Sequence, residues 1–178
     1  EVTWYPAKDL IFYQADIHGN QLVTERMKAL RKIIEGKPQT VITTFAALMS
    51  PQVPLEEIAA SVIHIDADSS LNEGELARKL AEMGYEKNYQ VDAPGQFSIR
   101  GGIIDIFDLT EENPYRIELW GEEVESIRSF DLLSQRSVEK LNEVDIYPAT
   151  EMMLSEEQKE KGLRRIEKEA KEFEEKLR

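Results

Sequence analysis

The residue types that most often catalyse reactions are sparse in this sequence and are not spaced as a catalytic site. The chain has two histidines and no cysteine. His64 lies between apolar residues, and His18 lies in a turn-like region without a nearby Ser or Cys nucleophile. Asp66 and Asp68 follow a strand-like run at 62–65, where a catalytic carboxylate could stand, but loop and cap roles are commoner. No nucleophile, base and orienting residue can be assembled, so we expect a chain that is not an enzyme on its own.

Nucleotide and metal binding are also disfavoured. A phosphate-binding loop needs glycines that free backbone N–H groups, followed by Lys and then Ser or Thr. The run Gly36, Lys37, Pro38 lacks the upstream glycine and the hydroxyl residue. We therefore predict no cofactor-binding residue and no metal ligand, and we expect a solvated acidic rim where carboxylates could gather at a hairpin end. Those carboxylates are Asp105, Asp108, Glu118, Glu122 and Glu123.

Arg100, Arg116 and Trp120 offer a different chemistry, that of partner binding. Successive side chains of a strand point to opposite faces, so the run 115–120 predicts an apolar core face and an outer face with Arg116 and Trp120. The same alternation in 96–100 places Arg100 outside. Interfaces concentrate their energy in Trp, Tyr and Arg because a rigid ring or guanidinium fork gives much contact for little lost freedom. The alternative is that Arg116 pairs with a neighbouring glutamate and that helices cover Trp120.

The stretch Gly95–Phe130 must position these three residues. Its alternating apolar and polar runs, cut by Gly, Pro and Asn, predict an antiparallel hairpin sheet. Gly101–Gly102 and Gly121–Glu122 are tight-turn signals, and irregular spacing after the second turn predicts a bulge. A preceding helix, with a capping box at 72–75 and a stop at Gly84, is expected to cover one face of the sheet.

The flanking segments predict an incomplete α/β layer. A turn at 19–20, a helix from Thr24 with Gly36 as its C-terminal cap, and a buried strand at 40–45 resemble the closing part of a βαβ layer. Short elements are expected at 55–60, 62–65 and 144–147, and LIFY in 9–14 marks a short strand or turn.

The last helix, which we expect to open with a capping box at Ser155 and Gln158, has an apolar seam. The seam residues are Leu163, Ile166, Ala170, Phe173 and Leu177. Such a seam must pack along a partner element or another chain, so self-association through 155–178 is one option.

Composition limits the partners. The 35 acidic and 22 basic residues give a net charge of −13, which opposes binding to a phosphate backbone. No basic stripe is visible, since Arg164 and Arg165 lie among glutamates.

No run reaches the roughly 18 apolar residues of a membrane span. With no cysteine for disulfides and no signal-like start, we expect a cytoplasmic protein, and the first residue, Glu1, suits a fragment of something longer.

Several long motifs resemble one bacterial repair module. PGQFSIRGGIIDIF, NPYRIELWGEEVESIRSFD, SQRS and VDIYPA are similar to the module shared by the transcription-repair coupling factors (Mfd) and UvrB, and YPAKDLIFYQ, ERMKALRKI and VITTFAALM extend the likeness over nearly the whole chain. The upstream part looks more like the coupling factors, since it lacks the tyrosine-rich hairpin with which UvrB holds DNA.

The resemblance implies a fold and a division of the chain. The fold is α/β and α+β: a partial helicase-like (RecA/Rossmann-like) layer without an ATP site at 1–60, an inserted antiparallel-sheet module like UvrB domain 2 at 61–148, and a helical return at 149–178. In the family the module docks UvrA, and its docking residues fall on Arg100, Arg116 and Trp120. The family often has phenylalanine at the last position, so the tryptophan is a departure that keeps the aromatic character.

The resemblance also implies a function without chemistry. We expect this chain to recruit UvrA to RNA polymerase stalled at DNA lesions. RNA polymerase, DNA, ATP and Mg would be bound by other domains of the longer protein, and no membrane is expected as a partner. The alternative is a nucleotide-dependent DNA-binding, helicase-like fragment similar to UvrB.

Overall fold

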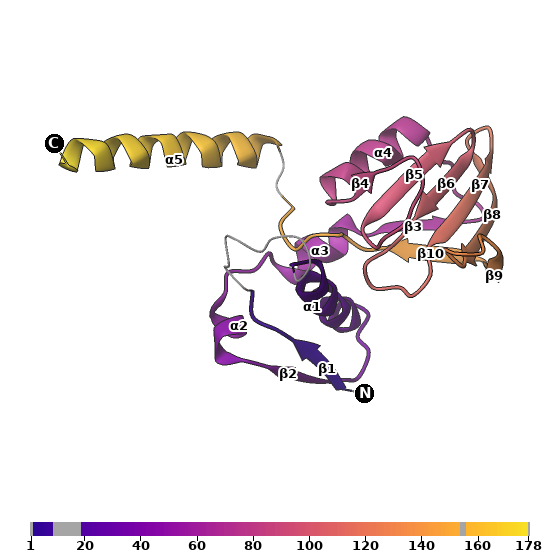
Figure 1. Cartoon of the computed structure of the whole chain (residues 1–178), viewed down its shortest axis with the longest axis horizontal. Helices are drawn as coiled ribbons and strands as arrows, with labels where there is room; N and C mark the ends of the chain where they lie inside the picture. Colours follow the sequence, from indigo (N-terminus) through magenta and orange to yellow (C-terminus); the bar gives the residue numbers. More distant parts are fainter. Residues whose placement is uncertain (1, 9–18, 154–155, 178) are drawn as a thin grey trace.

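A computed structural model describes residues 2–8, 19–153 and 156–177. Figure 1 shows a lobe of strands, a smaller layer of strands and helices beside it, and a long helix that extends away from both. The architecture is therefore mixed α/β with a C-terminal helix. None of the helices in these ranges is both long and apolar enough to cross a membrane.

The strand lobe is a six-stranded sheet in the order β4-β5-β6-β7-β8-β9, antiparallel except for the β4–β5 pair. The strands are β4 Glu86–Lys87, β5 Gln96–Arg100, β6 Ile103–Ile106, β7 Tyr115–Trp120, β8 Glu123–Phe130 and β9 Ser137–Leu141. Gly101, Gly102 and Gly121 have positive φ, which confirms the predicted tight turns. The register shifts between Glu118 and Leu119, so a bulge lies in the β7–β8 pair as expected.

The inner face of this sheet is closed by α4 Glu73–Glu82 and by the antiparallel pair β3 Ile63–Asp66 with β10 Glu143–Ile146. The Asn72 side chain accepts from the N–H groups of Gly74 and Glu75 at the start of α4, so the predicted cap is present. Leu76 and Leu80 of α4 are buried against Ile104 and Ile117 of the sheet. The helix therefore covers the sheet as predicted, and a single core fills the space between them.

The second layer is a parallel β1–α1–β2 unit, with β1 Val2–Tyr5, α1 Gly19–Ile34 and β2 Thr40–Thr43, followed by α2 Phe45–Met49 and α3 Leu55–Ser61. Gly19 begins α1, so the predicted turn at 19–20 is wrong: both residues are helical. Gly36 has φ +66° just after the helix, as a C-terminal cap requires. The LIFY segment lies outside the described residues.

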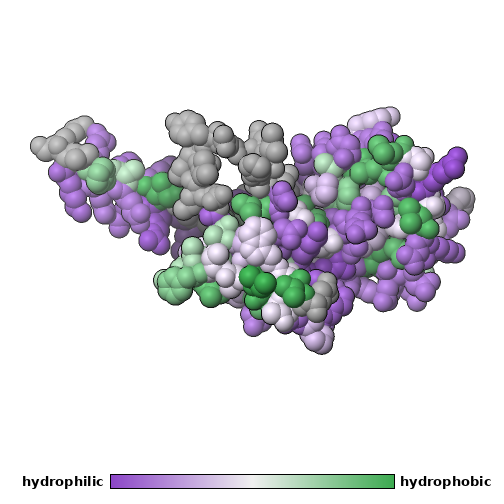
Figure 2. All heavy atoms as spheres, turned by 60° about the horizontal axis from the view of Figure 1, so that its bottom comes forward, coloured by the Kyte–Doolittle hydropathy of each residue, from purple (hydrophilic) through white to green (hydrophobic). Residues whose placement is uncertain are grey.

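The predicted burial of the 40–45 strand is wrong. Thr3 and Tyr5 of β1 are buried towards α1, whereas Val2 and Trp4 on the other face are 64% and 49% exposed, and Ile42 of β2 is 56% exposed. Figure 2 shows apolar side chains gathered over β1, β2 and α2. Among residues 2–8, 19–153 and 156–177, cover is found on one face of this parallel sheet, although parallel sheets normally have both faces buried.

The chain returns to α1 through residues 149–153. Glu151 is buried and forms hydrogen bonds with Arg26 of α1, which is itself fully buried. Helix α5, Glu156–Leu177, then leaves the body of the protein (Figure 1). Its seam residues Leu163, Ile166 and Phe173 are more than half exposed. The predicted capping box involves Ser155 and the Gln158 side chain, which lie outside what the structure describes.

Candidate functional site

The outer face of the sheet carries an arginine fork built on Asp105. Strand register places Arg116 of β7 directly opposite Asp105 of β6. Arg116 Nε donates to Asp105 Oδ1 at 2.6 Å and its Nη2 donates to Oδ2 at 2.9 Å, and Arg100 Nη2 donates to the same Oδ2 at 3.0 Å. The Asp105 side chain is 1% exposed. One buried carboxylate therefore orients both arginines.

Arg116 is held on every side. Its guanidinium lies over the Phe130 ring, 4.2 Å from the ring centroid, and Nη2 also donates to Gln135 Oε1 at 2.9 Å. The hydrogen bond with Asp105 raises the pKa of Arg116, against the opposing effect of burial. Because only 15% of its side chain is exposed, Arg116 stabilises the outer face and leaves little of its guanidinium accessible to a partner. Its ion pair is with an aspartate, and the neighbouring Glu118, the kind of partner weighed as an alternative, adds a weaker electrostatic attraction.

Arg100 and Trp120 are the accessible members of the set. The Arg100 side chain is 36% exposed and lies 5.6 Å from the centroid of the Tyr89 ring. Trp120 is 79% exposed at the end of β7, so neither α4 nor α5 covers it. Both lie on the face that alternation predicted. The structure thus brings Arg100 and Arg116 together on one carboxylate and leaves Trp120 as an exposed ring on the same face.

Three features of this face were not found from the sequence. Asp105 was expected in a solvated rim, which is wrong, because the aspartate is buried beneath two guanidiniums. Arg128 and Lys140 also face outward, since register aligns them with Arg116 across β8 and β9. Arg128 pairs with Glu118. An aspartate inside an apolar run, as in IIDIF, was the available signal that a charged partner lies opposite.

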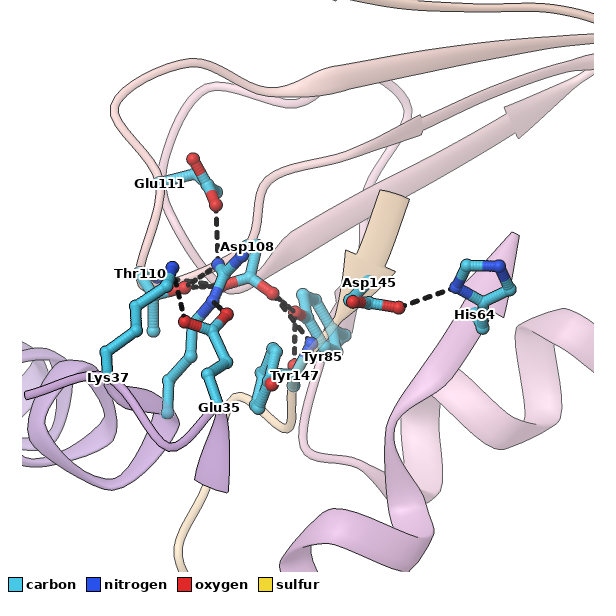
Figure 3. A network of polar contacts seen from close by, with 10 residues as sticks. Glu35, Lys37, His64, Tyr85, Asp108, Thr110, Glu111, Asp145 and Tyr147 are labelled. Atoms are coloured by element: carbon cyan, nitrogen blue, oxygen red, sulfur yellow. Dashed lines mark hydrogen bonds and ion pairs between the residues drawn. The ribbon is translucent and has the colours of Figure 1, made fainter. Parts of the chain in front are cut away.

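A second polar network joins α1 to the sheet lobe (Figure 3). Arg31 of α1 donates to Thr110 Oγ1 at 2.6 Å and to Glu111 Oε1 at 2.5 Å, and its Nε reaches Glu35 at 2.8 Å. Lys37 forms an ion pair with the other Glu35 oxygen at 2.6 Å. The contacts of Arg31 with Thr110 and Glu111 link residues about eighty positions apart in the sequence, so the network fixes the sheet lobe to α1.

Asp108 is the buried centre of this network, so its expected place in a solvated rim is also wrong. Its carboxylate accepts from the backbone N–H groups of Thr110 and Tyr147, each at 2.7 Å. Burial raises the pKa of Asp108, although those hydrogen bonds oppose the rise. Burial likewise raises the pKa of Tyr85, whose hydroxyl donates to the Tyr147 carbonyl at 2.6 Å. Perturbed pKa values can mark active sites, but here each group is already engaged by a neighbour, as in a structural junction.

Metal binding has no support in the parts of the chain that are described: there, no group of three or more His, Asp or Glu side chains is placed to hold an ion. His64 forms a hydrogen bond with Asp145 at 2.7 Å across the β3–β10 pair (Figure 3). That is the ordinary strand role expected for it.

The fold and its outer face define a class before any relative is considered: an interaction module, in which a rigid sheet presents oriented arginines and an exposed aromatic ring. The family model of the UvrB interaction domain matches residues 63–152. The chain belongs to this family, and the matched residues include the whole six-stranded sheet and its outer face.

Relatives with longer chains extend the likeness beyond the module. The chain is 39% identical over 166 residues to the transcription-repair-coupling factor of Bacillus subtilis (strain 168), covering 93% of this chain and 14% of that protein. The coupling factors of Staphylococcus aureus (strain MRSA252) and Myxococcus xanthus are each 35% identical, over 157 and 153 residues. The chain thus spans about one seventh of the length of the curated relatives it matches.

Proposed function

We propose that this chain recruits UvrA, through the outer face of its sheet, for transcription-coupled nucleotide excision repair. The observation that carries the proposal is the Asp105 fork: Arg100 and Arg116 are held on one buried carboxylate, on the face that also bears the exposed Trp120. Oriented donors and a rigid exposed ring are the groups that dominate protein interfaces. The family name and the names of the relatives support the same reading.

The three residues have different roles in this proposal. Trp120 is the anchor that the partner buries, and Arg100 gives a charge-assisted hydrogen bond to a partner carboxylate. Arg116 keeps Asp105 neutralised and the fork in place. No chemical step is assigned to the chain, and no cofactor is needed for the docking.

The longer protein supplies the rest of the proposal. We infer that 61–148 is the docking module, that 1–60 belongs to a helicase-like layer without an ATP site, and that 149–178 leads back to that layer. ATP, Mg, DNA and RNA polymerase are assigned to other domains of a longer protein that resembles the coupling factors. The recruitment would take place in the cytoplasm, where the polymerase stalls.

The test compares Arg100→Ala with Lys79→Ala for binding to purified UvrA. Both variants remove one positive charge, but Lys79 lies on α4, away from the outer face. Asp105 keeps its two bonds from Arg116 in the Arg100 variant, so the fold is retained. We expect the Kd to rise at least about tenfold for Arg100→Ala, since a hydrogen bond to a charged group is worth about 1.5–3 kcal/mol and about 1.4 kcal/mol is a tenfold change.

The Lys79→Ala variant is expected to bind as the wild type does. Equal affinity of both variants would remove the outer face from the proposal. ATP hydrolysis by the chain, or duplex binding that weakens steeply with salt, would instead favour the DNA-binding alternative.

A further inference from the structure

The turn that joins β8 to β9, residues 131–136, is closed by its own hydrogen bonds. Asp131 N–H donates to the Arg136 carbonyl at 2.9 Å, and Gln135 N–H donates to the Asp131 carbonyl at 2.8 Å. Ser134 donates through its N–H and its hydroxyl to Asp131 Oδ1, at 2.8 and 2.6 Å. The turn is therefore a rigid element, although it lies at the surface.

Gln135 fastens this turn to the arginine fork. Within the described ranges it is the non-glycine residue with a positive φ, at 57°, a conformation that costs L-residues other than Gly, Asn and Asp energy. Its Nε2 donates to the Leu132 carbonyl at 2.8 Å, and its Oε1 accepts from Arg116 Nη2 at 2.9 Å. Such strain persists where the surroundings over-determine it, and it is commonest at functional sites.

Leu133 is the side chain that this turn presents. It is 97% exposed, so it contributes almost nothing to the protein's own core. An apolar side chain held out by a hydrogen-bonded turn loses little further freedom when a partner covers it, and such pre-organisation favours affinity. The turn is continuous with the outer face of the sheet, which we call the docking face and which bears Arg100, Arg116 and Trp120. The link is Gln135, which contacts the same Arg116 that pairs with Asp105.

We propose that Leu133 is a second apolar anchor of the docking face, which enters an apolar pocket on UvrA whose rim carries the carboxylate that Arg100 binds. Gln135 is the positioning residue: it holds the turn against Arg116 so that Leu133 and Trp120 meet the partner together. This inference rests on the proposed recruitment of UvrA. It names a contact outside the three residues that define the face.

The test uses Leu133→Ser against Leu48→Ser in the whole chain, with purified UvrA as the ligand. Leu48 is also exposed, at 67%, but lies on α2. We expect the Kd to rise about tenfold for Leu133→Ser, with no change in the unfolding midpoint, and to stay within twofold of the wild type for Leu48→Ser.

The outcomes separate the two proposals. If Arg100→Ala weakens binding and Leu133→Ser does not, the second anchor is overturned and recruitment stands. If the wild-type chain does not bind UvrA, both are overturned.

The positioning role of Gln135 is tested by changing its side-chain oxygen, which accepts the hydrogen bond from Arg116. Gln135→Glu keeps an oxygen acceptor for Arg116 but loses the Nε2 donation to the Leu132 carbonyl, so its Kd should rise less than that of Gln135→Gly. Gln135→Gly relieves the positive φ but removes the acceptor, so we expect three- to tenfold weaker UvrA binding without a lower unfolding midpoint. If the Gly variant binds UvrA with wild-type affinity, the hydrogen bond between Gln135 and Arg116 is not needed to position Leu133, and the positioning role is overturned.

Discussion

The sheet lobe and the β1–α1–β2 layer differ in how far the chain covers their apolar surface. In the lobe, α4 and the β3–β10 pair close the inner face of the sheet, and the outer face carries the arginine fork and the exposed Trp120. In the layer, α1 covers one face, and in the described part of the chain Trp4, Ile42 and Phe45 are exposed on or beside the other. Both regions therefore present surfaces to a partner, but of different kinds.

The difference separates a docking face from an uncovered sheet face. Oriented charges and single exposed side chains are typical of a transient interface. A continuous apolar patch on a parallel sheet is typical of a face that another element covers permanently. We therefore expect other segments of a longer protein to cover the β1–β2 face.

The largest effect is expected where the two regions meet. Arg26→Met would leave the buried Glu151 with Lys8 as its remaining ion-pair partner, at 3.1 Å. Breaking a buried pair costs about 3–5 kcal/mol when the charge is left alone, so we expect a loss near the lower end of that range. Urea unfolding measures the loss, and amide exchange should locate it in α1 and residues 149–153 while the six-stranded sheet keeps its protection. Lys28→Met, at an exposed neighbouring position, is the control. A loss below about 1 kcal/mol would show that the pair does not hold the layer.

A smaller effect is expected from the exposed apolar face. Phe45 and Met49 are 78% and 69% exposed on α2, so replacing both with Ser should change the free energy of unfolding by less than about 0.5 kcal/mol. We expect this face to pair two copies of the chain when nothing else covers it, and sedimentation velocity over a range of concentrations should show the double variant weakening that association by about tenfold or more. Association that persists unchanged would point to the α5 seam instead, which Leu163→Ser together with Phe173→Ser would test.

The smallest effect is a pH dependence at the β3–β10 pair. The hydrogen bond with Asp145, with Glu143 and Asp66 nearby, raises the pKa of the exposed His64. A histidine whose folded pKa is raised stabilises the fold below its unfolded pKa of about 6.5, and that stability is lost as the pH rises through the folded value. Between pH 6 and 8 the wild type should therefore lose more stability than His64→Gln. Parallel curves for the two proteins would contradict this.

Sequence periodicity predicted much of the lobe, because the strands at 96–106 and 115–120 alternate and the turns at 101–102 and 121–122 contain the glycines that their backbones need. The same alternation placed Arg100, Arg116 and Trp120 on one face. It could not reveal that Asp105 orients both arginines, since which residues lie opposite one another depends on the register of separate strands. Nor could it place Asp108 at a buried junction, because that depends on how the lobe packs on α1.

Burial in the layer was the other failure. The β-branched run at 40–45 is typical of a buried parallel strand, yet Val41 and Ile42 are exposed here. The composition of a strand indicates that its side chains favour burial. Whether they are buried depends on whether another element packs over them. The positive φ of Gln135 has no sequence signal either, since glutamine has no preference for that conformation.

The central claim is that the outer sheet face, and not the apolar layer, binds UvrA. The most direct measurement is the Kd for UvrA of Trp120→Ala beside Phe45→Ala, since the two aromatic side chains are 79% and 78% exposed in different regions. The account predicts a rise of about thirtyfold for the tryptophan variant, as for a loss of about 2 kcal/mol at an anchor, and no change for the phenylalanine variant. Equal affinities, or a loss confined to Phe45→Ala, would contradict it.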